Sequence, residues 1–311
     1  MENAKALGGL KKKDIVDVAV AAGIIGIVLM IIIPMPSFFL DILIAVNITV
    51  SVVILLITIF ATEVLQFSIF PSVLLVTTLF RLAINVSSTR LILSEADGGS
   101  IIEAFGNFVI GGNYVVGIII FLIIVIIQFL VITNGAGRVS EVSARFTLDA
   151  MPGKQMSIDA DLNSGIITEE EAKKRRKNLQ LEADFYGSMD GASKFVKGDA
   201  IAGIIVTLIN VIAGIVIGSM MLGMEIGEAA STYVRLTVGD GLVSQIPALL
   251  ISTASGIIVT RSGEDTNLSR SLTNQFSAFP IVLLTASGIL GILALIPGLP
   301  TLPFLILALL T

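Results

Sequence analysis

The sequence predicts an all-α polytopic membrane protein with about eight transmembrane helices and a charged, helical cytoplasmic insert between spans four and five. Of the 311 residues, 55% are hydrophobic and 14% are charged, whereas about 25% charged residues are usual in a soluble domain. The apolar residues form runs of roughly 20, the length of a membrane-crossing helix rather than of a barrel strand. Residues 135–198 hold 20 of the 43 charged side chains, so the polar part of the chain is one insert.

Seven apolar runs are long enough to cross a bilayer, and an eighth is short. Pro34 and Pro36 follow the first run and predict a tight turn, so we expect spans one and two to form a helical hairpin. The eighth run would give about 18 Å of helix against a hydrocarbon core of about 30 Å, which predicts an incomplete span. The predicted spans are residues 15–33, 38–60, 69–92, 112–133, 200–222, 234–260, 276–296 and 300–311. The predicted domains are residues 1–134 with spans one to four, 135–198 with the insert, and 199–311 with spans five to eight.

The basic residues predict the orientation, because positive charge is concentrated on the cytoplasmic side of membrane proteins. With the N-terminus in the cytoplasm, 16 of the 19 Lys and Arg residues, Lys5 and Lys11 among them, fall in cytoplasmic segments. The remaining three, Arg81, Arg90 and Arg235, lie within spans or at their edges. We therefore expect a multi-pass protein with a cytoplasmic N-terminus and a cytoplasmic insert.

Two helices are predicted outside the spans. Residues 99–110 place apolar side chains at helical spacing, which indicates a short amphipathic helix on the outer face. Thr168 and Glu171 form a capping box, which predicts the start of a helix that ends at Gly187. The basic run 173–177 on that helix is a solvated face or, alternatively, a contact for anionic lipid or an acidic partner.

The composition excludes several kinds of chemistry. The chain has no Cys and no His, so a disulfide framework, a thiol nucleophile, a Ser-His-Asp triad and imidazole metal ligation are impossible. Gly153 and Lys154 are followed by Gln155 rather than Ser or Thr, so there is no Walker A motif. We expect no enzymatic activity, no metal, no organic cofactor and no nucleic-acid partner.

Polar side chains within the spans mark the candidate site, because a charge at mid-depth of a bilayer costs about 2.5–3.5 kcal/mol. Four such residues lie on one stripe of span three, which cannot face lipid: Arg81, Asn85, Ser88 and Thr89. Asp41 and Asn47 lie in span two, and Gln128 lies in span four.

Two acidic residues in the second half of the chain leave alternatives open. Asp240 is flanked by two glycines and followed by Pro247, which favours a broken helix that lines a cavity. For Arg81 and Asp240, the alternative to a functional role is a structural ion pair, for example of Arg81 with Asp41 or Asp240. Asp199 opens span five as either a helix N-terminal acid favoured by the macrodipole or a protonatable carboxylate at a pathway mouth.

Small residues recur at a spacing that lets membrane helices approach closely. Gly214 and Gly218 form a GxxxG step, and Ser287 and Gly291 form a similar step in span seven. The spacing predicts helix packing and only weakly suggests oligomers.

Four strings closely resemble the signatures of the bacterial flagellar and type III secretion export-gate family, the FHIPEP family. RVSEVSARFTLDAMPGKQMSIDAD lies in the insert at 138–161. The other three are FRLAINVSSTR at 80–90, YGSMDGASKFVKGDAIAGI at 186–204 and VGDGLVSQIPALLISTASGIIVTR at 238–261. They occur in the family's order, and the resemblance covers nearly the whole chain. ADFYGSMDGASKF looks more like the flagellar than the virulence branch.

The resemblance implies a subunit of the proton-motive-force-driven gate that exports unfolded protein across the bacterial plasma membrane, with sodium as coupling ion in some members. Family members form homo-oligomeric rings, typically nonamers, in the basal body. They act with a smaller membrane gate protein, a core export channel, a soluble ATPase complex and substrate–chaperone complexes. The family's eight membrane helices precede a large cytoplasmic domain, which we expect to be absent from this chain.

The resemblance also implies roles for single residues, carried over by matching string. Asp199 is the best candidate for a proton-accepting carboxylate. The other ion-coupling candidates are Arg81, Arg90, Lys194, Asp240 and Asp41. The signature residues of the insert are Arg138, Glu141, Arg145, Asp149, Pro152, Gly153, Lys154, Asp159 and Asp161.

Two hypotheses compete with the export gate. An ordinary ion channel or small-solute carrier would bind its substrate within one protomer and need no soluble partner. A passive scaffold would use its intramembrane charges only to hold a ring together, so neutralising Asp199 would harm assembly but not proton movement. A virulence type III secretion paralogue remains the alternative within the family.

Overall fold

The computed structural model describes residues 12–110, 114–261, 268–296 and 300–310. Lys5 and Lys11, which the predicted orientation uses, lie outside the described residues. The described parts of the chain consist of helices and their connections, with no strand. The helices are α2 (Lys12–Ile32), α3 (Ser37–Phe60), η2 (Val64–Phe67), α4 (Phe70–Glu95), α5 (Gly99–Ile110), α6 (Tyr114–Ile127), η3 (Gln128–Thr133), α7 (Asn134–Asn163), α8 (Glu169–Met220), α9 (Ile226–Val259), α10 (Leu268–Ser277), α11 (Pro280–Ala294) and α12 (Thr301–Leu310).

The prediction of an all-α polytopic membrane protein is confirmed. Among the described residues, five helical segments are long and apolar enough to cross a membrane, or six if the bent pair α10 and α11 counts as one span. The five correspond to predicted spans two to six. The predicted total of eight is not confirmed, because the first and last predicted spans give shorter apolar helices.

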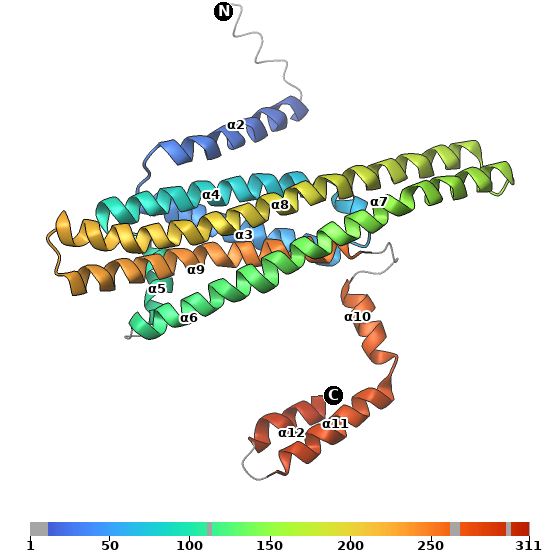
Figure 1. The fold of residues 1–311 in the computed structure, drawn as a ribbon. Coiled ribbons are helices and arrows are strands. Elements are labelled where there is room, and N and C mark those ends of the chain that lie inside the picture. Colours follow the sequence, from blue (N-terminus) through green and yellow to red (C-terminus); the bar gives the residue numbers. More distant parts are fainter. Residues whose placement is uncertain (1–11, 111–113, 262–267, 297–299, 311) are drawn as a thin grey trace, which may run out of the picture.

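The central bundle is built around α4, α8 and α9 (Figure 1). Helix α8 packs on both α4 and α9, and α9 also contacts α3, α5 and α6. Beyond the bundle, α7 and the first half of α8 continue as a long antiparallel hairpin (Figure 1). The last two helices, α11 and α12, pack mainly on each other.

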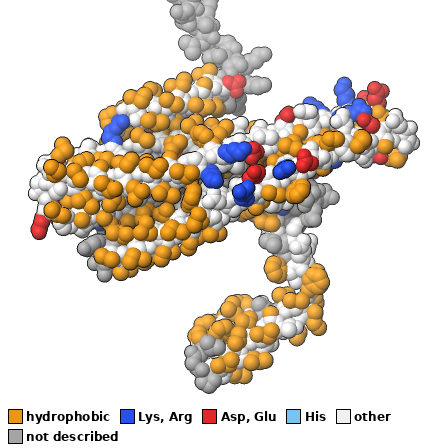
Figure 2. All heavy atoms as spheres, in the orientation of Figure 1, with side chains coloured by type: hydrophobic (Ala, Val, Ile, Leu, Met, Phe, Trp, Pro, Cys, Tyr) orange, Lys and Arg blue, Asp and Glu red, His pale blue; other side chains and the backbone are white. Residues whose placement is uncertain are grey.

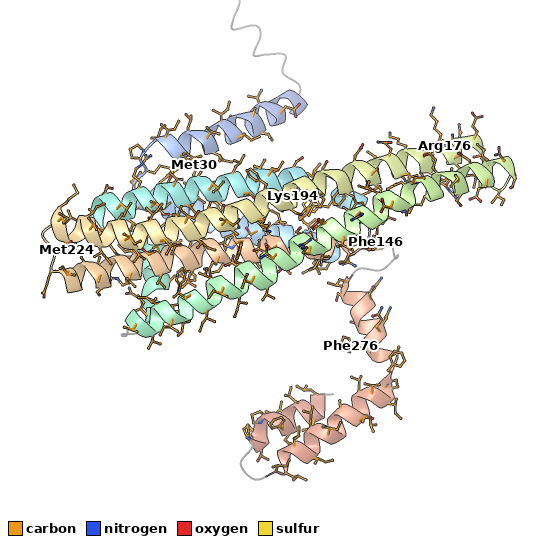
Figure 3. All side chains as sticks on the ribbon, viewed as in Figure 1. Met30, Phe146, Arg176, Lys194, Met224 and Phe276 are labelled. Atoms are coloured by element: carbon orange, nitrogen blue, oxygen red, sulfur yellow. The ribbon has the colours of Figure 1, made fainter. Side chains whose placement is uncertain are left out.

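The surface follows the same division. Apolar side chains cover the visible face of the bundle, whereas acidic and basic side chains gather along the hairpin (Figure 2). Met224 and Arg176 mark opposite ends of the long axis, and Lys194 lies between them (Figure 3). The chain thus has one apolar part that fits a bilayer and one polar part that projects from it.

Helix α8 is continuous, so the predicted end of a helix at Gly187 is wrong. Its beginning is as expected, because the Thr168 side chain accepts a hydrogen bond from the Glu171 backbone N–H at 3.2 Å. A glycine in a helix interior costs about 1 kcal/mol. Burial of Phe185, Tyr186 and Met189, which flank Gly187, offsets that cost.

Helix α9 is also unbroken, so the predicted break around Asp240 is wrong. The two glycines beside Asp240 serve close packing instead. A Cβ on Gly239 would overlap the backbone of Ile102 on α5, and a Cβ on Gly241 would overlap the ring of Phe121 on α6. The two glycines, which resemble a helix break in the sequence, instead allow α5 and α6 to approach α9 closely.

The turn after the first predicted span is present, but the expected hairpin of spans one and two is not the main packing. Helix α2 packs mainly on α4. The Arg90 guanidinium donates hydrogen bonds to the carbonyl oxygens of Ile31 at 3.0 Å and Ile32 at 2.9 Å. The Ser87 hydroxyl donates to the Met30 carbonyl oxygen at 3.0 Å. These bonds satisfy carbonyl groups that every helix C-terminus leaves open.

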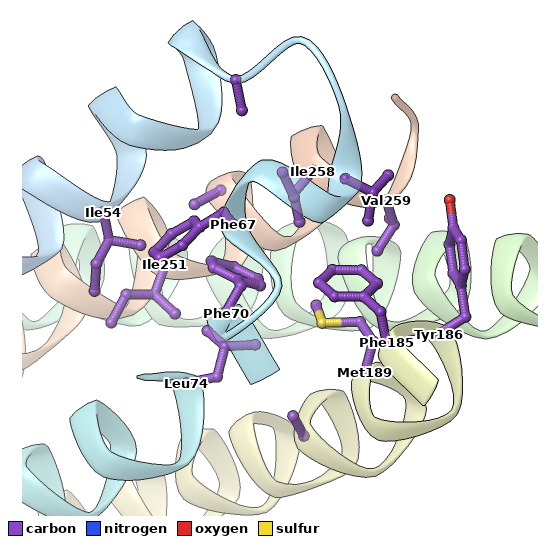
Figure 4. Packing of buried hydrophobic residues seen from close by; sticks show 14 of the residues in the cluster. Ile54, Phe67, Phe70, Leu74, Phe185, Tyr186, Met189, Ile251, Ile258 and Val259 are labelled. Atoms are coloured by element: carbon purple, nitrogen blue, oxygen red, sulfur yellow. The ribbon is translucent and has the colours of Figure 1, made fainter. Parts of the chain in front are cut away.

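An apolar core fixes the base of the hairpin to the bundle (Figure 4). Phe185 and Met189 of α8 lie in one buried cluster with Phe70 of α4 and Ile258 of α9. Three helices that are distant in sequence, α4, α8 and α9, therefore meet where the polar hairpin begins.

Candidate functional site

An ion pair between Arg81 and Asp199 lies inside the bundle. Arg81 is on α4 and Asp199 is on α8, and their side chains are 3% and 2% exposed. Guanidinium Nη2 contacts carboxylate Oδ2, whereas Nη1 and Oδ1 are buried without a hydrogen-bond partner. Pairing of Arg81 with Asp41 or Asp240, the predicted structural alternative, is therefore wrong. The interpretation of Asp199 as a helix N-terminal acid is wrong too, because α8 begins at Glu169.

A polar cavity of about 60 Å³ adjoins the ion pair. Its walls come from α4, α6, η3, α8 and α9, so residues from five elements converge there. A cavity of this size has room for a few water molecules, each of which needs roughly 10–15 Å³. The polar side chains that line it are Arg81, Asn85, Gln128, Asp199, Thr207, Asp240, Ser244 and Gln245.

Asp240 supplies a second buried carboxylate to the same cavity. The residue is 5% exposed, and it lines the cavity together with Arg81 and Asp199. One turn later, the Ser244 hydroxyl donates to Asn85 Oδ1 at 2.7 Å. The polar stripe that the sequence places on span three therefore faces α8 and α9, as its position away from lipid requires.

A π-helical segment, η3, forms the remaining polar wall. Gln128 begins this segment, and its Nε2 donates to the Gln245 carbonyl oxygen at 3.5 Å. The Gln245 side-chain oxygen is buried without a partner. Short π-helical segments inside α-helices are frequent at functional sites.

The loss of either charge from this ion pair would have a structural consequence. In a low-dielectric interior, two opposite charges attract strongly, and removal of one leaves the other poorly solvated. Protonation of Asp199 would remove its charge, and the Asp240 carboxylate lies in the same cavity as an alternative partner for Arg81. Among the described residues, no three Asp, Glu, His or Cys side chains come together as metal ligands would.

Three other predicted coupling residues lie outside the cavity. Arg90 binds the end of α2, as described above. Asp41 accepts hydrogen bonds from the backbone N–H groups of Ser100 and Ile101, each at 3.0 Å, and so caps the first turn of α5. Lys194 is 71% exposed and pairs with Asp190 at 2.7 Å.

The signature residues of the insert lie along α7. Several of them bridge to α8: Lys154 contacts Glu182 at 3.1 Å, and Asp159 contacts Arg176 at 2.5 Å. The third bridge joins Asp161 to Arg175 at 3.4 Å. The basic run 173–177 is therefore partly engaged with α7 rather than wholly solvated.

The remaining signature residues make local contacts or none. Arg138 pairs with Glu141 at 3.3 Å, and Arg145 lies 4.0 Å from Asp149, in each case within α7. Pro152 lies inside the helix without ending it, and nothing lies within 4 Å of a Cβ placed on Gly153.

Among the buried polar contacts that sequence reasoning missed is one between α8 and α4. Asn210 of α8 is 0% exposed, and its amide donates to the Thr89 hydroxyl at 3.2 Å. The amide of Asn210 within the largely apolar run of span five could have indicated such a contact from the sequence.

Comparison with known proteins finds related chains. The FHIPEP family matches residues 27–311. The chain is 61% identical to the flagellar biosynthesis protein FlhA of Bacillus subtilis over 279 residues, which cover 90% of this chain and 41% of that protein. It is 55% identical to FlhA of Escherichia coli over 282 residues, which cover 89% of this chain and 41% of that protein.

A virulence-associated relative is similar to the same degree. The low calcium response locus protein D of Yersinia pestis is 56% identical over 296 residues, which cover 94% of this chain and 42% of that protein. The chain thus spans about two fifths of the length of these relatives. No solved structure matches it. A family match over most of the chain, together with identities above one half, shows that the chain belongs to the FHIPEP family.

Proposed function

We propose that this chain is a membrane subunit of a bacterial protein-export gate, of the flagellar kind, and that Asp199 couples proton movement to export. The names of the FlhA relatives support the flagellar role. The observation that carries the coupling is the buried Arg81–Asp199 ion pair beside a polar cavity that holds a second carboxylate.

In the proposed mechanism, a proton reaches Asp199 through water in the cavity. The neutral carboxyl group no longer holds Arg81, whose buried charge then favours the Asp240 carboxylate. Helix α8 runs without a break from Asp199 back to the polar hairpin, so a shift of α8 against α4 would also move the hairpin. Proton influx through about 100 mV supplies roughly 2.3 kcal/mol per charge, so movement of a protein segment would need several protons.

The size of the cavity favours an ion over a solute. Binding sites for small molecules usually enclose about 300–1,000 Å³, whereas this cavity has about 60 Å³. At this cavity, binding of an organic solute is therefore the weaker alternative to binding of an ion.

We further propose the surroundings that the family implies. The protein would lie in the bacterial plasma membrane, with the N-terminus and the α7–α8 hairpin in the cytoplasm. It would act without enzymatic activity or organic cofactor, as a homo-oligomeric ring with a smaller gate protein, an export channel and a soluble ATPase complex. A virulence secretion role is the second candidate, because the Yersinia relative is about as similar as FlhA of Escherichia coli.

The test compares a variant that loses one charge of the ion pair with a variant that loses both. In the full-length protein, Asp199→Asn leaves Arg81 unpaired, whereas the double variant Arg81→Leu/Asp199→Leu removes both charges. Protein export and acidification of the cell interior would be measured together, after ring assembly is verified. Asp184→Asn is the matched control, because Asp184 is exposed on the same helix and only accepts a hydrogen bond from Gln180.

Coupling through Asp199 predicts that the double variant assembles but neither exports protein nor acidifies the cell. A passive scaffold predicts that the double variant recovers export, because its helices pack without an uncompensated charge. Recovery of export in the double variant would therefore refute the coupling role.

A further inference from the structure

A second polar pocket lies between α7 and α8, at the level where α8 changes from charged to apolar. Its volume is about 500 Å³, and it shares no lining residue with the cavity beside the Arg81–Asp199 ion pair. Acidic and basic side chains lie next to the apolar surface of the bundle (Figure 2). Lys194, labelled in Figure 3, is one of them. The lining residues are Asn134, Gly137, Arg138, Glu141, Asp190, Ser193, Lys194 and Lys197.

The charges of this interfacial pocket do not cancel. It has three cationic and two acidic side chains. Arg138 pairs with Glu141 and Lys194 with Asp190, but both cations are more than two thirds exposed, so these pairs are weak and easily redirected. For Lys197, no ion pair is found within the described parts of the chain.

An unpaired hydroxyl adds to the polar character of the interfacial pocket. Ser193 Oγ is buried without a hydrogen-bond partner, and the Asn134 amide lines the pocket from α7. Ammonium, hydroxyl and amide groups together are donors that suit a phosphate group.

The surface on the membrane side of the pocket is apolar and open. Ile201 and Ile205 follow Lys197 by one and two turns of α8, and they are 41% and 53% exposed. Leu130 precedes Asn134 by about one turn and is 58% exposed. A ligand that fills the pocket with its charged end would lie along this wall with its apolar end.

We propose that the interfacial pocket binds the headgroup of an anionic phospholipid, with the acyl chains against the wall formed by Ile201, Ile205 and Leu130. Basic pockets between membrane helices are typical headgroup sites. This apolar wall favours a lipid over free phosphate, because free phosphate has no acyl chain that could pack against it. The site depends on the membrane location of the bundle and not on its role in export.

Lys197 and Arg138 position the phosphate, whereas the basic run 173–177 lies too far along α8 to take part in the same site. Lys177 precedes Lys197 by 20 residues on the uninterrupted helix α8, which places them about 30 Å apart. The sequence allowed a contact of the basic run 173–177 with anionic lipid. We instead place the lipid contact at the base of the hairpin.

The experiment uses the full chain, purified in mild detergent and offered equal amounts of phosphatidylglycerol and phosphatidylcholine. Native mass spectrometry counts the lipids retained per chain. The test variant is Arg138→Gln/Lys197→Gln, and the matched control is Lys173→Gln/Lys177→Gln, which removes the same charge from the distal part of the hairpin.

We expect the unmodified chain to prefer phosphatidylglycerol and the test variant to lose roughly fivefold in retention per removed charge, the weight of one basic residue at an anionic surface. The control variant should match the unmodified chain. Equal retention of both lipids by the unmodified chain would overturn the proposal without any variant. Equal losses in test and control would overturn it as well, as would displacement of the lipid by inorganic phosphate alone.

A second copy of the chain is the other possible occupant of the pocket. The 311 residues contain no cysteine, so a Lys197→Cys variant reports contacts at this position directly. Efficient disulfide formation between copies in native membranes would assign the pocket to a protein interface and reject the lipid.

Discussion

Arg81 of α4 and Asp199 of α8 form an ion pair from which solvent is almost completely excluded. Two charges in such a place are costly to desolvate, and their mutual attraction compensates only when both are present. Each residue therefore depends on the other, and the contact between α4 and α8 depends on both.

Removal of one partner should destabilise the protein far more than removal of both. We expect Arg81→Leu to lower the free energy of unfolding by about 3–5 kcal/mol, because it leaves Asp199 buried without a counter-charge. The double variant Arg81→Leu/Asp199→Leu should recover most of that loss. Thermal unfolding in detergent measures both. If the double variant is as unstable as the two single variants combined, the residues do not act as a pair.

Arg90 should hold α2 on α4. Its guanidinium donates to two carbonyl oxygens at the end of α2, and hydrogen bonds from charged groups are each worth about 1.5–3 kcal/mol. Arg90→Leu should therefore speed hydrogen exchange in residues 17–32 by one to two orders of magnitude, roughly the effect of one such bond.

Arg90→Lys provides the matched control, because it keeps the charge but lacks the planar fork by which two nitrogens of Arg90 reach two carbonyl oxygens. It should give an intermediate exchange rate in α2. Unchanged exchange in Arg90→Leu would show that apolar packing alone fixes α2, and the predicted coupling role of Arg90 would then regain weight.

The sequence predicts which side chains face the protein interior rather than lipid, but it does not predict which helix they contact. Periodicity places Arg81, Asn85 and Ser88 on one stripe, and all three are buried in the structure. The partner of Arg81 did not follow from the sequence, because Asp41, Asp240 and Asp199 are all acidic residues in or beside spans. Only the packing of α8 on α4 decides among them.

The two wrong predictions of helix ends, at Gly187 and beside Asp240, both rested on glycines. Gly187 and Gly239 resemble helix ends because glycine has low helix propensity. In the structure, Gly239 instead accommodates the backbone of α5. A sequence alone does not say whether a glycine is there for backbone freedom or for the absence of a side chain.

The GxxxG step of α8 should tolerate no larger residue. Cβ atoms on Gly214 and Gly218 would overlap the ring of Tyr233, which is 0% exposed on α9. We expect Gly214→Val to cost about 1–3 kcal/mol, the usual penalty for overpacking a core. Gly291→Val is the control, since nothing lies within 4 Å of a Cβ at that position. Equal loss of thermal stability in the two variants would contradict the packing role.

The polar hairpin should be sensitive to salt, because its two helices are joined by partly exposed ion pairs. Arg176 binds Asp159 through Nη2 at 2.5 Å and Nε at 3.2 Å, and Arg175 lies 3.4 Å from Asp161. Pairs of this exposure contribute about 0.2–1 kcal/mol each and are screened by ions. Arg175→Ala/Arg176→Ala should therefore raise hydrogen exchange in residues 155–180 severalfold at low salt.

At about 1 M salt the difference from the unmodified chain should nearly vanish, because the screening length falls to about 3 Å. Lys173→Ala/Lys177→Ala is the matched control: both side chains are exposed, and neither has an ion pair within the residues that the structure describes. A salt-independent loss in the arginine variant would mean that the arginines act through apolar packing of their stems. An equal loss in the lysine variant would mean that the helix needs its net charge rather than these bridges. Only a salt-dependent loss confined to the arginine variant fits a hairpin joined by the acidic residues of the insert.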